Sequence, residues 1–175
     1  MKTLIRRITL QDAETLSALS KKTFYDTFTG TCTEEDMQQF LHEYFDLEVV
    51  KKELSNENDF YFFIEVDGTP SGYLRLMEDY SNFELMKQWK ALELKRIYVD
   101  KPFHGQGLAQ QLTAFAENFA KENEYEVLWL GVWEHNLRAK KFYEKMGFKD
   151  SGYMHDFPIG NTPQRDNWLW KFLNS

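Results

Sequence analysis

The stretch Pro102–Ala109, which reads PFHGQGLA, joins a strand-like run at residues 91–99 to a helix-like run that begins at residue 107. Three of its positions, Gly105, Gly107 and Ala109, carry small residues. Small residues at such a place either allow the protein to pack closely against itself or allow a ligand to approach the main chain. The turn by itself does not decide between these two interpretations, so its surroundings have to.

The length and net charge of the chain limit the kinds of protein that it can be. The chain has 175 residues and a formal net charge of -7, which predicts one domain over residues 1–175 and disfavours a nucleic-acid partner. An acidic surface mildly favours cationic small molecules, although it can equally serve solubility alone. No apolar run approaches the ~20 residues of a membrane span, and the N-terminus does not read as a signal peptide. We therefore expect a cytoplasmic protein without a membrane partner, and its oligomeric state stays open.

The spacing of apolar residues predicts an α+β fold. Helical spacing predicts helices at 10–28, 47–54, 107–122 and 136–146, with one more beginning after a capping pattern at Thr33 and Asp36. Strand patterns are found at 3–8, 60–66, 71–78, 91–99, 127–133, 148–155 and 165–172. A strand–helix–strand crossover in the middle predicts one parallel strand pair within a mostly antiparallel mixed sheet.

The strand before the turn contains an irregularity. In LELKRIYV the alternation of apolar residues loses its phase at Lys95 and Arg96. An inserted residue changes the phase of a period-two pattern, so we predict a β-bulge there, of the kind that often accompanies active sites. The alternative is that the long charged side chains simply extend to solvent from a regular strand.

The turn also opens a helix in a locally basic region. A helix N-terminus presents unpaired N–H groups and a partial positive charge, which suit phosphate. Four basic side chains surround it in the sequence, namely Lys95, Arg96, Lys101 and His104. These features together favour a phosphate-binding turn on an otherwise acidic protein.

Two motifs in this order resemble the GNAT N-acetyltransferase superfamily. The first is His104-Gly105-Gln106-Gly107-Leu108-Ala109, which matches the acetyl-CoA loop of that family except that His stands where Arg or Gln is usual. The second runs from Trp133 to Phe148 and fits N-x-x-A-x-x-F-Y-x-x-x-G-F. The resemblance implies a three-layer fold with helices on both faces of the sheet, and direct acetyl transfer from acetyl-CoA to an amine.

The resemblance also implies site residues. Those expected to bind the cofactor are Ile97, Tyr98, Val99, His104, Gly105, Gln106, Gly107, Leu108, Ala109, Gln110, Asn136 and Tyr143. Tyr143 is the candidate general acid, because a phenol is protonated at neutral pH and can donate to a leaving thiolate. Helical spacing alone would explain it as a packing residue. Glu93 is the candidate general base, and the alternatives are an ordinary surface carboxylate and a chain of waters.

The acceptor is suggested by a narrower resemblance. Thr23-Phe24-Tyr25-Asp26-Thr27-Phe28, KKELSNENDFYFFI and WLGVWEHN are similar to PaiA-type spermidine/spermine acetyltransferases. Carboxylates among aromatic side chains suit a polycationic amine, so we expect acceptor binding by Tyr25, Asp26, Trp133 and Glu134. Acetylation of a peptide N-terminus and a non-catalytic CoA-binding module remain alternatives. The four histidines and the lone Cys32 show no metal-site spacing, so no metal is expected.

Overall fold

The computed structural model describes residues 1–173 and contains one seven-stranded sheet with the strand order β1-β2-β3-β4-β5-β7-β6. Every neighbouring pair is antiparallel except β4 and β5. The strands are β1 (Thr3–Arg7), β2 (Asp59–Val66), β3 (Thr69–Met77), β4 (Ala91–Val99), β5 (Val127–Trp133), β6 (Lys149–Asp156) and β7 (Arg165–Phe172). The predicted mixed sheet with one parallel pair is confirmed.

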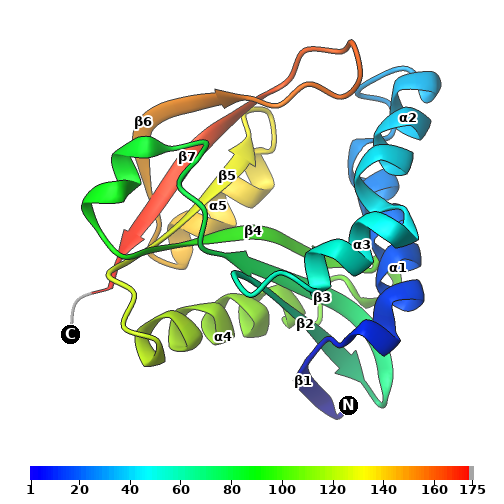
Figure 1. Ribbon diagram of the computed structural model, residues 1–175, viewed down its shortest axis with the longest axis horizontal. Coiled ribbons are helices and arrows are strands. Elements are labelled where there is room, and N and C mark those ends of the chain that lie inside the picture. Colours follow the sequence, from blue (N-terminus) through cyan, green and yellow to red (C-terminus); the bar gives the residue numbers. More distant parts are fainter. Residues whose placement is uncertain (174–175) are drawn as a thin grey trace.

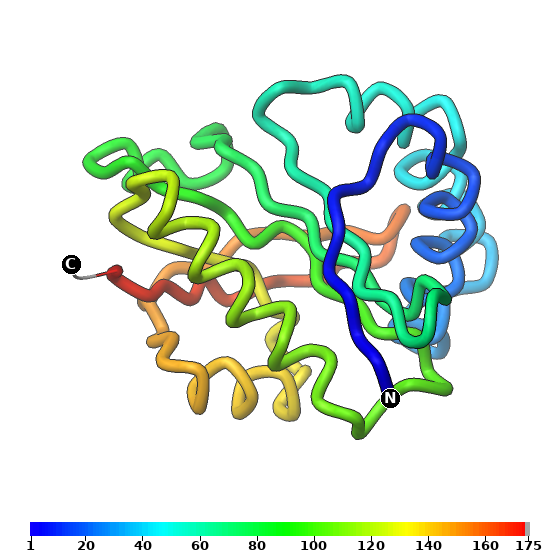
Figure 2. Tube along the Cα trace, turned by 90° about the horizontal axis from the view of Figure 1, so that it is seen from below, coloured from blue at the N-terminus to red at the C-terminus, as the bar shows by residue number. Residues whose placement is uncertain are grey.

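Helices cover both faces of this sheet, as predicted (Figure 1). They are α1 (Ala13–Phe28), α2 (Glu34–Phe45), α3 (Leu47–Leu54), α4 (Leu108–Glu122) and α5 (Leu137–Lys145), with short 3₁₀ helices at 10–12, 84–88 and 101–103. Alternate residues of β2 separate the two layers: Phe62 packs with α4, whereas Tyr61 packs with α1 and α3. In the view from below, α4 crosses the strands and α1–α3 lie to one side (Figure 2).

The predicted bulge is present in β4. Arg75 of β3 pairs with Arg96, but the next residue, Leu76, pairs with Leu94, so Lys95 is the extra residue. A bulge of this kind shifts the phase of the strand, which is why Leu94 and Ile97 both pack toward α4 and α5.

The parallel pair is short. Only Ala91–Glu93 of β4 pair with Val127–Trp129 of β5, and beyond them the two strands separate, as Figure 1 shows. β5 continues alongside β7 as far as Trp133. We call the place where β4 and β5 separate the fork. It leaves β4 without a neighbour on this side from Leu94 onward, which frees backbone groups of the bulged half of the strand.

Helix ends follow the predicted signals with one difference. The Thr33 hydroxyl accepts a hydrogen bond from the Asp36 amide at 3.1 Å and so caps α2. The Asp36 carboxylate does not return this bond. It accepts instead from the Thr162 hydroxyl at 2.7 Å, in the loop between β6 and β7. Gly147, at φ 96°, follows α5 in the predicted left-handed conformation. No helix among the described residues has the length and apolar character needed to cross a membrane.

Candidate active site

The glycines of the turn are required by backbone conformation and not by packing. Gly105 and Gly107 have φ values of 79° and 78°, in the left-handed region that favours glycine. A Cβ built at Gly105 would meet no atom within 4 Å, and one at Gly107 would meet only the flexible end of Gln110, at 3.2 Å. The space in front of the turn is therefore open, and the close-packing interpretation of the small residues is wrong.

The turn presents the start of α4 to this open space. Within residues 1–173, no side chain caps the helix at Gly107, so its first amides keep their donor capacity. Leu108 is buried and can offer a ligand only its backbone, whereas Gln106 and Gln110 are exposed. His104 folds back, and its Nε2 donates to the Val99 carbonyl at 2.7 Å. This bond ties the turn to the end of β4.

The exposed backbone of β4 lies between two side-chain layers. Ile97 and Val99 pack toward α4 and α5. Tyr98 faces α1–α3 and stacks on Tyr73, with 5.8 Å between ring centroids. The three residues expected along the cofactor arm are thus partly buried and follow the bulge directly.

Tyr143 stands on the α4–α5 side of the sheet. Its side chain is 7% exposed and meets Phe142 and Phe148 edge-on. Burial raises the pKa of Tyr143 above its ordinary value, which keeps the phenol protonated. At the other end of α5, Asn136 accepts a hydrogen bond from the Ala139 amide at 3.1 Å and caps the helix, as predicted.

Glu93 lies at the last parallel pair, opposite Trp129. The residue is 4% exposed, so the interpretation as an ordinary surface carboxylate is wrong. Burial raises the pKa of Glu93. Its one ion-pair partner in the described chain is Lys95, 3.8 Å away, which is too far for a hydrogen bond.

Sequence reasoning missed Asp166. This residue of β7 pairs with Trp133 of β5, and its Oδ2 lies 3.0 Å from where a Cβ on Gly131 would be. The pKa of Asp166 is raised to about 6, mainly by burial; Lys95 opposes this rise and Glu93 contributes to it. A single polar residue in a strand pattern carries no signal of this position, because only the pairing of β7 with β5 brings it there.

Trp133 and Glu134 meet the loop between β6 and β7. The Trp133 Nε1 donates to the Gln164 side chain at 2.7 Å. Glu134 forms an ion pair with Arg165 at 3.1 Å. Both expected acceptor residues at this end are therefore already bonded, Trp133 to that loop and Glu134 to the first residue of β7.

Tyr25 and Asp26 lie on α1 with different partners. The Tyr25 hydroxyl donates to Glu34 at 3.3 Å, and Asp26 is 3.4 Å from the Lys22 ammonium. Lys22 also contacts Asp100, in the turn after β4. Ion pairing thus connects Asp26 to the end of β4, and it connects Glu134 to β7.

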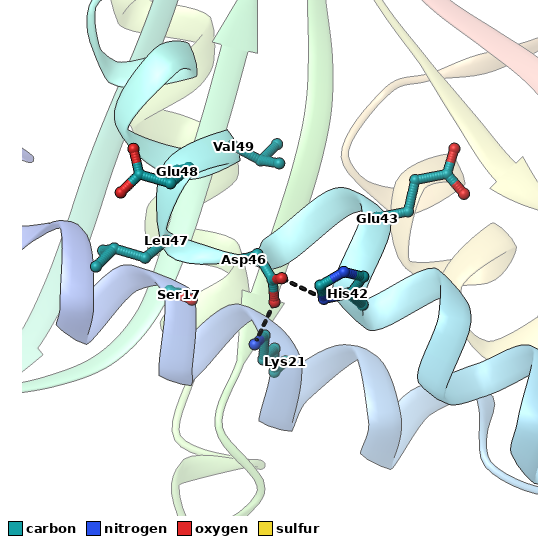
Figure 3. Close-up of a pocket in the computed structure, with 8 residues that line it drawn as sticks. All are labelled: Ser17, Lys21, His42, Glu43, Asp46, Leu47, Glu48 and Val49. Carbon is teal, nitrogen blue, oxygen red and sulfur yellow. Dashed lines mark hydrogen bonds and ion pairs between the residues drawn. The ribbon is translucent and has the colours of Figure 1, made fainter.

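Two hollows lie elsewhere on the surface. One, of about 600 Å³, lies among α1, α2 and α3, where Lys21 and His42 both contact Asp46 (Figure 3). The other, of about 460 Å³, is lined by residues 134–135 and the loop between β6 and β7. Neither includes the glycine turn. In the part of the chain that the structure describes, no three metal-ligating side chains gather at one point.

The site thus combines a glycine turn at a helix start, a fork in the sheet and a buried tyrosine. The model of the acetyltransferase (GNAT) family matches residues 21–148. An uncharacterized N-acetyltransferase from the pepI 3' region of Lactobacillus delbrueckii subsp. lactis is 38% identical over 170 residues, which are 97% of this chain and 96% of that protein. The chain belongs to the GNAT family and is an acetyl-CoA-dependent N-acetyltransferase.

Solved structures share the whole fold. The PaiA N-acetyltransferase of Thermoplasma acidophilum, in complex with coenzyme A, has a TM-score of 0.78 at 23% identity and covers 98% of this chain and 99% of its own. The ribosomal-protein-S18-alanine N-acetyltransferase of Escherichia coli has a TM-score of 0.70 at 14% identity, with 99% and 96% covered. At these identities the likeness concerns the fold.

Proposed function

We propose that this enzyme acetylates a primary alkylamine, with a polyamine such as spermidine or spermine as its acceptor, by direct transfer. The observation that carries this proposal is the pair of incompletely neutralised carboxylates, Glu93 and Asp166, on the α1–α3 face of the sheet at the fork. Carboxylates out of water need a cation, and an ammonium group supplies one. The net charge of -7 adds long-range attraction for a polycation.

The loop between β6 and β7 favours a small acceptor. Its Gln164 donates to the Thr31 carbonyl at 3.2 Å, and its Thr162 is bonded to Asp36. These contacts tie the loop to α2 and to the turn between α1 and α2, so that the loop lies beside α2 (Figure 1). A peptide would need an open groove here, so we favour a small cation.

The chemistry follows from where the side chains lie. The phosphates of acetyl-CoA are expected on the amides of residues 105–110, and the pantetheine arm along Ile97–Val99. Glu93, directly or through a water, takes a proton from the acceptor ammonium. The nitrogen lone pair attacks the thioester carbon, and an exposed N–H at the bulge, that of Ile97, stabilises the developing oxyanion. The C–S bond breaks, and the thiolate takes the proton of Tyr143. The nitrogen releases its second proton, which restores the Tyr143 phenol, and Glu93 returns its proton to solvent.

Asn136 is proposed to contact the cofactor while it caps α5. Tyr25, Asp26, Trp133 and Glu134 remain proposed acceptor contacts, with the distal ammonium groups as their ligands. For Glu134 this requires that a ligand ammonium compete with Arg165. We also propose that residues 1–175 form a single cytoplasmic domain that needs no metal.

The test is thiol release from acetyl-CoA with spermidine, spermine, butylamine and a short peptide as acceptors, at low and high salt. We expect a higher kcat/KM for the polyamines than for butylamine, and a steeper loss of it in salt. If the peptide has a higher kcat/KM than every amine, the acceptor is a peptide N-terminus and the proposal of a polyamine is wrong. CoA binding without turnover on any acceptor would indicate a regulatory module.

A further inference from the structure

Asp166 is a carboxylate without a protein partner. It is partly buried, yet it forms no hydrogen bond or ion pair with any side chain of residues 1–173. Ionised carboxylates that leave water are ordinarily paired or hydrogen-bonded. Either solvent alone hydrogen-bonds to the Asp166 carboxylate, or the carboxylate binds a ligand.

The Asp166 carboxylate lies close to the backbone of β5. Gly131 of β5 has no room for a side chain, because a Cβ there would lie 2.9 Å from the Trp168 ring and 3.0 Å from the Asp166 carboxylate. Any side chain at Gly131 would push Asp166 away. The glycine thus lets the carboxylate lie against β5, just past the fork.

The charges around Asp166 do not balance. From β4, Lys95 lowers the pKa of Asp166 and Glu93 raises it, and Asp166 in turn raises the pKa of Tyr98. From β6 it faces His155, its partner in the sheet, which stacks on Trp168. Burial and Lys95 lower the pKa of His155, so this ring is neutral at pH 7. Lys95 is the cation that acts on both carboxylates. Arg75 and Arg96 also act on Glu93, but they are paired with Asp59 and Glu53, and Asp79 adds a further negative charge. Glu93 and Asp166 are therefore incompletely neutralised.

We infer that Asp166 binds the protonated nitrogen of the acceptor and, with Glu93, holds it over the fork. A primary ammonium has three N–H donors for such contacts, and it brings positive charge to a place where the carboxylates are incompletely neutralised. The inference rests on the proposed function, because it supplies the contact that selects an amine over a neutral nucleophile. It makes Asp166 a substrate-binding residue and leaves Glu93 as the proton acceptor.

Asp166→Asn tests this contact, with Asp150→Asn as the matched control. Asp150 is an exposed aspartate of β6 whose Oδ1 accepts from the Gly152 amide, a bond that asparagine can also make. Loss of a charge-assisted hydrogen bond should raise the KM of butylamine roughly tenfold or more in Asp166→Asn. The KM of acetyl-CoA should stay the same in both variants. An unchanged amine KM in a folded Asp166→Asn protein would overturn the inference.

The wild-type protein offers a test that needs neither folding of the variant nor turnover. Methylguanidinium keeps its charge throughout the accessible pH range and carries N–H donors. Measured by calorimetry, its affinity should fall several-fold between about pH 7.5 and about pH 5, as the carboxylates take up protons. A pH-independent affinity, or no binding at all, would sink the inference. If butylamine is not acetylated but methylguanidinium binds in this pH-dependent way, the proposed function fails and the cation site stands.

Discussion

Replacing Asp166 with asparagine should stabilise the protein at neutral pH, although it should impair amine binding. The pKa of Asp166 is raised from 3.8 to about 6, mainly by burial. A raised carboxyl pKa means that the folded state disfavours the charged form. Protonated Asp166 therefore contributes to the stability of the fold. This contribution is complete below the pKa of the group in the unfolded chain, and it is lost as the pH rises through its pKa in the folded protein. Asparagine is neutral at every pH and avoids that loss.

The magnitude follows from proton affinity. Each tenfold change in affinity is worth ~1.4 kcal/mol, so a rise from 3.8 to about 6 corresponds to at most ~3 kcal/mol in the free energy of unfolding. The advantage of Asp166→Asn over wild type should be absent near pH 3.8, should grow up to about pH 6 and should then be constant.

Urea unfolding of both proteins at about pH 4 and about pH 7.5 measures this difference. Taking the difference between proteins at each pH removes the effect of other titrating groups. Asp150→Asn, whose carboxylate is exposed, should show no such pH-dependent gain. A gain of equal size at both pH values, or a loss confined to neutral pH, would refute the argument that Asp166 is buried without compensation.

Three further changes test other parts of the structure. Gly107→Val should abolish acetyl-CoA binding, measured by calorimetry. The control Gly152→Val, at a similar positive φ with free space around it, should cost a comparable ~1–3 kcal/mol of stability and leave binding intact. Equal CoA affinity in both variants would contradict a role of the turn in binding phosphate. Tyr143→Phe should lower kcat roughly 10²–10⁴-fold with CoA affinity retained, and wild-type turnover with rate-limiting chemistry would leave only packing for this side chain. Arg75→Met should lower the free energy of unfolding in urea by about 3–5 kcal/mol, because Arg75 and Asp59 are nearly buried and bonded at 2.7 Å. The Arg75→Met/Asp59→Leu double variant should recover most of this stability. If it does not, the loss does not come from an unpaired Asp59.

Much of the fold was predictable from the sequence because its signals are local. The strand at 165–172 has the predicted ends, and most other elements begin and end within about two residues of their predicted bounds. The break in the apolar alternation at Lys95 and Arg96 predicted the bulge, because an extra residue changes the face of the sheet on which every later side chain lies. Asn136 and Gly147 marked the ends of α5 through bonds and angles that depend only on neighbouring residues.

What only the tertiary structure decided concerns which groups meet. The glycine turn allowed both a packing and a ligand interpretation until the open space around Gly105 was known. In the sequence, Glu93 occupies a polar position of an alternating strand, which is typical of a side chain on the surface. Its burial depends on which other elements of the fold cover that face of the sheet. Asp166 is about seventy residues from Glu93 in the chain, and the two lie in the same part of the sheet only because β7 pairs with β5 and β5 with β4. A sequence specifies its own periodicity and its caps, but the electrostatics of a site depend on burial and on charges from distant strands, which no local pattern encodes.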